Sequence, residues 1–137
     1  MHIDNYVQLK YGHISSVASG VLRVLAGNPK PLTFRGTNSY VIGDDVVSIL
    51  DPGPDMDAHV NAVLEAVDGR KVAYIFVTHS HVDHSGAAQR LSDLTGAEIL
   101  GFGPLPDLIP SNCVEQDYHL DFEPHRCLSD GEEVGFG

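Results

Sequence analysis

The chain has 137 residues, which suits one small domain built around a single hydrophobic core. Its 8 lysines and arginines against 19 aspartates and glutamates give a formal net charge of −11, which disfavours nucleic acid as a partner because cationic side chains supply most of that affinity. No apolar run approaches the ~20 residues that cross a bilayer, and no signal peptide is recognisable at the N-terminus, so we expect a cytoplasmic protein with no membrane partner.

Short strands dominate the first fifty residues. Aliphatic and β-branched residues predict strands at 20–25, 37–42 and 46–50. Two prolines break the connection between the first two strands. The turn Gly43-Asp44-Asp45 joins the second and third strands, so we expect these two to form a hairpin.

A helix is predicted next. Asp55 is placed to be its N-cap and Gly69 to end it. Apolar residues at helical spacing predict its buried face: Met56, Val60, Val63, Leu64 and Val67. His59, on the same helix, carries no recognisable pattern.

The strand–helix order is then repeated. Residues 72–77 are almost continuously apolar, which is typical of a strand covered on both faces. A second helix is expected at 85–95, followed by a strand at 97–102. The inward residues of this helix are predicted to be Ala87, Ala88, Leu91 and Leu94. The order of elements indicates a layered α/β fold, and the missing glycine-rich signature argues against a dinucleotide site.

The last third of the sequence is less regular. Prolines 104, 106 and 110 predict an irregular connection, and Asp130-Gly131 predicts a turn that leads into a new strand. The two cysteines do not make a disulfide framework, and we interpret them as reduced thiols. The spacing of four further metal-competent residues fits no common zinc ribbon or finger: Cys113, His119, His125 and Cys127.

Four metal-competent side chains lie close together directly after the apolar strand: His79, His81, Asp83 and His84. Residues two apart in extended backbone point to the same side, so His79 and His81 should project together from the carboxyl end of the strand. Open α/β sheets place their ligands at that end. Asp83 and His84 are adjacent at the turn into the next helix and can point to a second position nearby.

This set of residue types predicts a divalent metal site. Neutral imidazole and carboxylate suit zinc and similar ions. Two ions held ~3.5–4 Å apart could share a hydroxide, and a bound metal lowers the pKa of water from ~15.7 to ~7. The competing interpretation is a polar surface loop, which would explain one histidine better than three histidines and an aspartate.

The motif from His79 to His84 resembles that of the metallo-β-lactamase-fold hydrolases. Three flanking segments are similar to the branch of hydroxyacylglutathione hydrolase and β-lactamase-like protein 2: Gly36-Thr37-Asn38-Ser39-Tyr40, Ile49-Leu50-Asp51-Pro52-Gly53 and Thr95-Gly96-Ala97. The resemblance runs from about Val21 to the end of the chain. It implies an α/β fold, the N-terminal half of a four-layer αβ/βα sandwich, with a mixed sheet and helices on one face. Residues 1–137 would be a single partial domain.

The resemblance also implies roles for individual residues. His79 and His81 would bind a first metal, and Asp83 and His84 a second. Asp83 would also take a proton during turnover. Asp51 would steady the metal-binding loop by hydrogen bonding, although a simple turn residue ahead of Pro52 is the competing interpretation. The expected cofactor is one or two zinc ions, with iron or manganese as alternatives.

Part of the family pattern is not matched. Complete members supply a further histidine in a His-Thr-Pro-Gly-His-like segment, a bridging aspartate and a late histidine, and none of these is recognisable after His84. Two protein ligands per metal are fewer than the three of a typical catalytic zinc. We therefore expect metal affinity to fall and the hydrolase site to be incomplete in this chain alone. The sheet face left open would favour a homodimer.

Three functional hypotheses follow. The first is a metal-dependent hydrolase whose metal-activated water attacks a small-molecule thioester, ester or lactam, or a phosphodiester, with thioesters favoured by resemblance and RNA disfavoured by charge. The second is a catalytically inactive metal-binding fragment or assembly module. The third is a plain α/β binding domain, in which alanine at His79 and His81 would change neither metal content nor stability.

Overall fold

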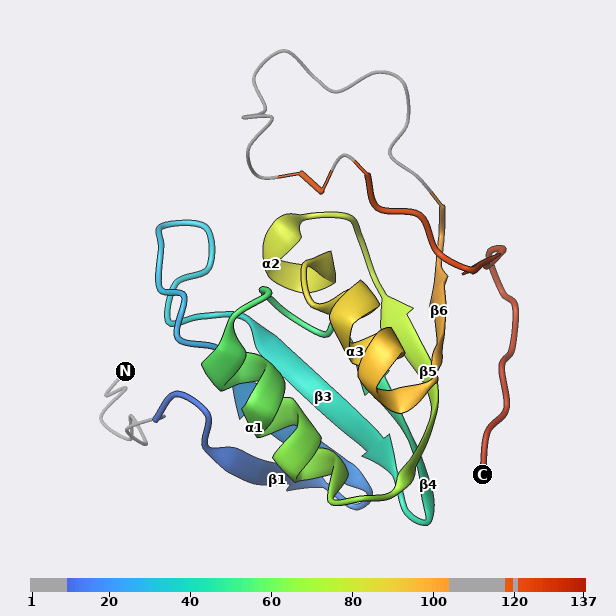
Figure 1. Ribbon diagram of the computed structural model, residues 1–137, viewed down its shortest axis with the longest axis horizontal. Coiled ribbons are helices and arrows are strands. Elements are labelled where there is room, and N and C mark those ends of the chain that lie inside the picture. Colours follow the sequence, from blue (N-terminus) through green and yellow to red (C-terminus); the bar gives the residue numbers. More distant parts are fainter. Residues whose placement is uncertain (1–9, 104–117, 120) are drawn as a thin grey trace, which may run out of the picture.

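The structure is a computed structural model that describes residues 10–103, 118–119 and 121–137. Within these residues the chain forms a seven-stranded mixed sheet with helices packed on one face (Figure 1). The elements in chain order are β1 (Ile14–Ala18), β2 (Val21–Leu25), β3 (Asn38–Gly43), β4 (Val46–Leu50), α1 (Asp57–Val67), β5 (Lys71–Val77), α2 (Val82–Ser85), α3 (Ala88–Thr95), β6 (Glu98–Gly101) and β7 (Arg126–Cys127). The predicted α/β class is confirmed. No helix in the described ranges is long and apolar enough to span a membrane.

The order of strands in the sheet follows the order in the chain. β1 to β4 are antiparallel neighbours, which confirms the predicted hairpin of β3 and β4. From β4 onward each strand pairs parallel to the next. A parallel connection needs a crossover, and α1 and then α2 with α3 provide these crossovers. The carboxyl ends of β4 and β5 therefore meet at one edge of the sheet.

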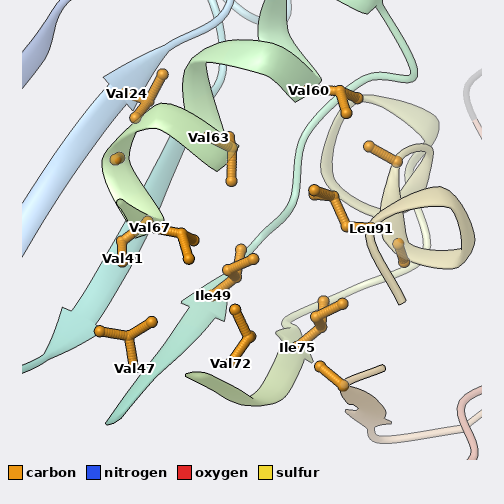
Figure 2. Packing of buried hydrophobic residues seen from close by; sticks show 14 of the residues in the cluster. Val24, Val41, Val47, Ile49, Val60, Val63, Val67, Val72, Ile75 and Leu91 are labelled. Carbon is orange, nitrogen blue, oxygen red and sulfur yellow. The ribbon is translucent and has the colours of Figure 1, made fainter. Parts of the chain in front are cut away.

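The core lies between the sheet and the helices. Val41, Ile49 and Ile75 are almost completely buried on neighbouring strands and face α1 and α3 (Figure 2). Each such side chain contributes about 1.5–3 kcal/mol by leaving water. On the opposite face, Leu50 is in register with Phe76, and both are only half-buried. The prediction that β5 is covered on both faces is therefore wrong for the side away from the helices.

The helix predicted at 85–95 begins later, at Ala88 as α3, and a separate short helix, α2, precedes it. The backbone N–H of Ala87 donates to the carbonyl of Gly53, 2.9 Å away, instead of continuing the helix. At Gly86 a Cβ would lie 2.5 Å from the Val82 carbonyl oxygen, so the close contact requires glycine. Ala87, Ala88 and Leu91 are buried as predicted, whereas Leu94, also predicted to point inward, is 58% exposed.

The predicted N-cap is also wrong. Met56 is the N-cap of α1 and makes no side-chain hydrogen bond, while Asp55 forms an ion pair with Arg90 at 3.0 Å. The carboxylate of Asp55 therefore connects α1 to α3 rather than capping its own helix.

The C-terminal part differs from expectation as well. A turn forms at Asp130-Gly131, where the N–H of Glu132 donates to the Ser129 carbonyl. No strand follows it in residues 132–137, and the two-residue strand β7 precedes it instead. The predicted irregular connection at the three prolines lies outside the described residues.

Candidate metal centre

The predicted cluster lies where β5 ends and α2 begins. His79, His81, Asp83 and His84 line one cavity of about 490 Å³. The opposite wall of this cavity comes from the loop between β2 and β3: Asn28, Lys30, Pro31, Leu32 and Thr33. Figure 1 shows this loop projecting from the same end of the sheet as α2. The four predicted residues thus share one cavity, although they come from both the strand end and the following helix.

The three imidazole rings of the cluster are in contact. The ring centroids of His79 and His81 are 4.7 Å apart, with the rings edge to face. Those of His79 and His84 are 4.3 Å apart. The His81 ring also packs against Tyr118 at 4.6 Å. His79 therefore lies between the other two histidines, as expected if extended backbone directs His79 and His81 to one side.

Asp51 connects three elements at this edge of the sheet. It follows β4, and its Oδ1 accepts the backbone N–H of Thr78, directly after β5, at 2.8 Å. The hydroxyl of Thr78 donates to the same carboxylate. Oδ2 of Asp51 lies 2.9 Å from Nδ1 of His84. A carboxylate behind a histidine fixes the ring orientation and leaves the other nitrogen free for a ligand. The role proposed for Asp51 toward a metal stays a prediction.

Asp83 and His84 form a second close pair. Nε2 of His84 and Oδ2 of Asp83 are 3.3 Å apart. Two donors on one tetrahedral zinc, with bonds of about 2.0–2.2 Å, lie about 3.3–3.5 Å apart. The separation therefore fits two ligands of one ion. The same Oδ2 accepts a hydrogen bond from the hydroxyl of Thr37 at 3.0 Å.

The cluster is not a complete metal site. In the parts of the chain that the structure describes, no group of three or more histidine, cysteine, aspartate or glutamate side chains is arranged to hold a metal ion. The donor types fit a divalent cation, but they are available as pairs rather than as a converging set. Metal binding by this cluster therefore stays a prediction.

Neighbouring groups in the cluster shift one another's pKa values. Burial by itself raises the pKa of Asp51, but hydrogen bonds from His84 and Thr78 outweigh it, so the pKa lies below its usual value. The hydrogen bond to Asp51 raises the pKa of His84. Burial lowers the pKa of His79, and the neighbouring His84 and His81 lower it further. A lowered pKa favours the neutral form of the His79 ring, which is the form that binds a metal.

No role was predicted for His59, which the structure places beneath the Asp51–Gly53 loop. It is 2% exposed, and its Nε2 lies 2.8 Å from Oγ of Ser39. Gly53, at a φ of +85°, packs directly on the ring. Gly53 also donates its N–H to the carbonyl of His84. Burial lowers the pKa of His59 to about 4. The helical spacing between His59 and Val63, four residues later, is the sequence signal that could have predicted this burial.

The described residues of the second zinc-site candidate do not line this cavity: His119, His125 and Cys127. Nδ1 of His119 lies 3.1 Å from Oγ of Ser85, and Nδ1 of His125 accepts the N–H of Ile99. Cys127 is an exposed free thiol. Cys113 lies outside the described residues.

Comparison with known proteins was made for sequence and for structure. The family model of the metallo-beta-lactamase superfamily matches residues 32–106. The chain is 32% identical over 125 residues to the beta-lactamase-like protein 2 homolog of Caenorhabditis elegans, which covers 88% of this chain and 40% of that protein. It is 35% identical over 97 residues to the lactamase-like protein nscB of Trichophyton rubrum, which covers 64% of this chain and 30% of that protein.

Solved structures show the same fold. The metallo-beta-lactamase SMB-1, in a complex with mercaptoacetic acid, superposes with a TM-score of 0.62 at 22% identity, covering 86% of this chain and 47% of that one. A beta-lactamase domain protein from Burkholderia ambifaria gives a TM-score of 0.55 at 24% identity, covering 71% of this chain and 33% of that one. The chain thus spans less than half the length of these relatives.

Proposed function

Because the chain belongs to the metallo-β-lactamase superfamily, a family of hydrolases, we propose that it supplies part of the active site of a metal-dependent hydrolase. One observation carries the proposal. The three histidines and the aspartate of the motif line a single cavity, and Asp51 orients one of them. A polar surface loop does not require that these donors lie together or that a buried carboxylate supports them.

We assign the donors in pairs. His79 and His81 would hold one divalent cation, and Asp83 and His84 a second. Zinc is the expected ion, with iron or manganese as alternatives. When bound, the cation would supply a nucleophile at neutral pH, because it lowers the pKa of water from ~15.7 to ~7.

The other roles belong to the residues of the chain. Asp51 holds the His84 ring so that its Nε2 faces Asp83. The lowered pKa of His79 favours its neutral ring, the form that can bind a cation. Asp83 would accept a proton at a carboxylate oxygen during turnover, as the resemblance implies.

The substrate that the cavity favours is a small molecule. Pro31 and Leu32 supply apolar surface, with Leu32 81% exposed, and Lys30 supplies a positive charge. An acyl group beside Leu32 and an anionic group beside Lys30 would fit a thioester or ester better than a long nucleic acid, which the charge of −11 disfavours.

One alternative function is favoured by a specific observation. The described residues contain no group of three metal donors, whereas a catalytic zinc usually has three protein ligands. A metal-binding module without turnover, or one completed by donors from another chain, is therefore the second candidate.

Elemental analysis tests the proposal. The purified chain, His81→Ala and the matched control His13→Ala would be saturated with zinc, desalted and measured. His13 is exposed and does not line the cavity. We expect bound zinc in the wild type and in His13→Ala, and a clear loss in His81→Ala. No bound zinc in the wild type would refute the proposal.

Activity separates the two candidates. The zinc-loaded chain would be assayed with a chromogenic thioester and with a phosphodiester. Turnover that His81→Ala abolishes supports the hydrolase, whereas bound zinc without turnover supports the metal-binding module.

A further inference from the structure

We propose that Thr37 is a positioning residue that holds the carboxylate of Asp83 and ties it to the cavity wall formed by the β2–β3 loop. This inference rests on the proposed function, because Asp83 is one of the proposed metal donors. It goes further by giving roles to Thr37 and Asn28, neither of which is a metal donor.

The first observation is a continuous chain of hydrogen bonds. The backbone N–H of Thr37 donates to Oδ1 of Asn28 at 2.9 Å. Nδ2 of Asn28 donates in return to Oγ1 of Thr37 at 3.1 Å. Oγ1 of Thr37 then donates to Oδ2 of Asp83 at 3.0 Å. These residues come from three places: the β2–β3 loop, the residue before β3, and α2.

The donor and the acceptor of each of these three hydrogen bonds can be assigned. A backbone N–H can only donate, so the amide oxygen of Asn28 must face Thr37. Its amide nitrogen must then donate to the Thr37 hydroxyl, whose single proton is left for Asp83. Thr37 is 4% exposed, so water does not easily replace these partners. The hydroxyl therefore acts as a fixed donor and not as a freely rotating one.

A fixed donor restricts how the Asp83 carboxylate can turn. Oδ2 of Asp83 accepts the hydrogen bond from Thr37 and lies 3.3 Å from Nε2 of His84. These two contacts together set the orientation of the carboxylate. Asp51 fixes the His84 ring from the other side. Thr37 thus restrains Asp83 as Asp51 restrains His84, but it does so at the same Oδ2 that faces His84, whereas Asp51 contacts the ring nitrogen on the far side from Asp83.

The second observation links this support to the cavity wall. The carbonyl of Asn28 accepts the hydroxyl of Thr33 at 2.6 Å, and that hydroxyl accepts the N–H of Lys30 at 2.8 Å. These bonds fold the loop that carries Leu32, whose exposed side chain lines the cavity. Asn28 therefore sets the position of the apolar wall relative to Asp83.

Two substitutions at Thr37 test the inference. Thr37→Val removes the hydroxyl but keeps the branched side chain and the backbone N–H, whereas the matched control Thr37→Ser keeps the hydroxyl. Zinc affinity would be measured by competition with a chromophoric chelator. We expect Thr37→Val to lower the affinity by about 10- to 100-fold, the usual effect of losing a residue that supports a metal ligand. Thr37→Ser should bind zinc as the wild type does.

A measurement on the metal-free protein is independent of zinc. Hydrogen–deuterium exchange of residues 28–37 should become faster in Thr37→Val and also in Asp83→Ala, because each removes one end of the same hydrogen bond. Thr37→Ser should leave the exchange unchanged. If Thr37→Val does not fold, Thr37→Ser and Asp83→Ala still give this comparison.

Several results would overturn the inference. These are wild-type zinc affinity in a folded Thr37→Val, an affinity of Thr37→Ser as low as that of Thr37→Val, or unchanged loop exchange in Asp83→Ala. A wild-type chain that binds no zinc would instead refute the proposed function. The coupling of the loop to Asp83 would then be decided by exchange alone, with faster exchange in Asp83→Ala supporting it.

Discussion

Acid should destabilise this protein through His59, a buried histidine that lies beneath the candidate site. Its folded-state pKa is about 4, against 6.5 for an ordinary histidine. Between these values the unfolded chain binds a proton that the folded chain excludes. The free energy of unfolding therefore falls as the pH drops below about 6.5, and the loss levels off below about 4.

The size of this loss follows from the shift. One pKa unit corresponds to about 1.4 kcal/mol, so the contribution of His59 should fall by about 2 kcal/mol from neutral pH to about pH 5, and by about 3 kcal/mol at about pH 4. The structure supplies the cause. The ring is 2% exposed, so a proton on it would be poorly hydrated, and this burial outweighs the backbone hydrogen bond with Pro52, which raises the pKa.

Urea unfolding at about pH 7 and about pH 5 measures this loss in the wild type and in His59→Gln. Glutamine does not titrate, so the difference between the two proteins isolates His59 from the other acidic and basic groups. We expect the wild type to lose about 2 kcal/mol more than His59→Gln. Equal losses in the two proteins would refute the reasoning, and a matched change in His13→Gln, an exposed position, would show that burial is not the cause.

Two further substitutions probe the support of the site. Gly53→Ala should destabilise the fold by about 2 kcal/mol or more, because φ is +85° and the new Cβ would lie 2.4 Å from Nε2 of His59; an unchanged urea midpoint would contradict this close packing. Asp51→Ala should cost about 1–3 kcal/mol, because the N–H of Thr78 loses its acceptor. The same substitution should return the raised pKa of His84 toward its ordinary value, as followed by NMR titration, and a pKa that stays raised would show that Asp51 is not its cause.

Asp51 and Thr37 support the two members of the Asp83–His84 pair in a similar way. Asp51 and Thr37 both lie next to strand ends, and each contacts a residue of α2 through its side chain. The carboxylate of Asp51 also accepts the backbone N–H of Thr78, and the hydroxyl of Thr37 also accepts a hydrogen bond from the side-chain amide of Asn28. Preorganised donors need such supports, because a free aspartate or histidine would lose conformational entropy on binding an ion. The positions of the proposed donors thus depend on the sheet, not only on the motif.

Local pattern was enough to predict most of the elements. Alternating and continuous apolar residues predicted β2 to β6, and the spacing of Val60, Val63 and Val67 predicted α1, because these periods report which face of an element is buried. The closely spaced histidine motif also predicted the place of the candidate site. That prediction requires only that the backbone be extended before His79 and that it turn after His81.

Only the tertiary structure decided which distant groups meet. The hydroxyl of Thr37 contacts Asp83 across 46 positions, and Asp51 contacts His84 across 33. Likewise, the carbonyl of Gly53 draws the N–H of Ala87 out of a helix that periodicity alone would have continued. The periodicity of apolar residues shows which face of each element is buried, but not how the elements are positioned relative to one another. Hydrogen bonds between elements depend on that relative position to within a few tenths of an ångström.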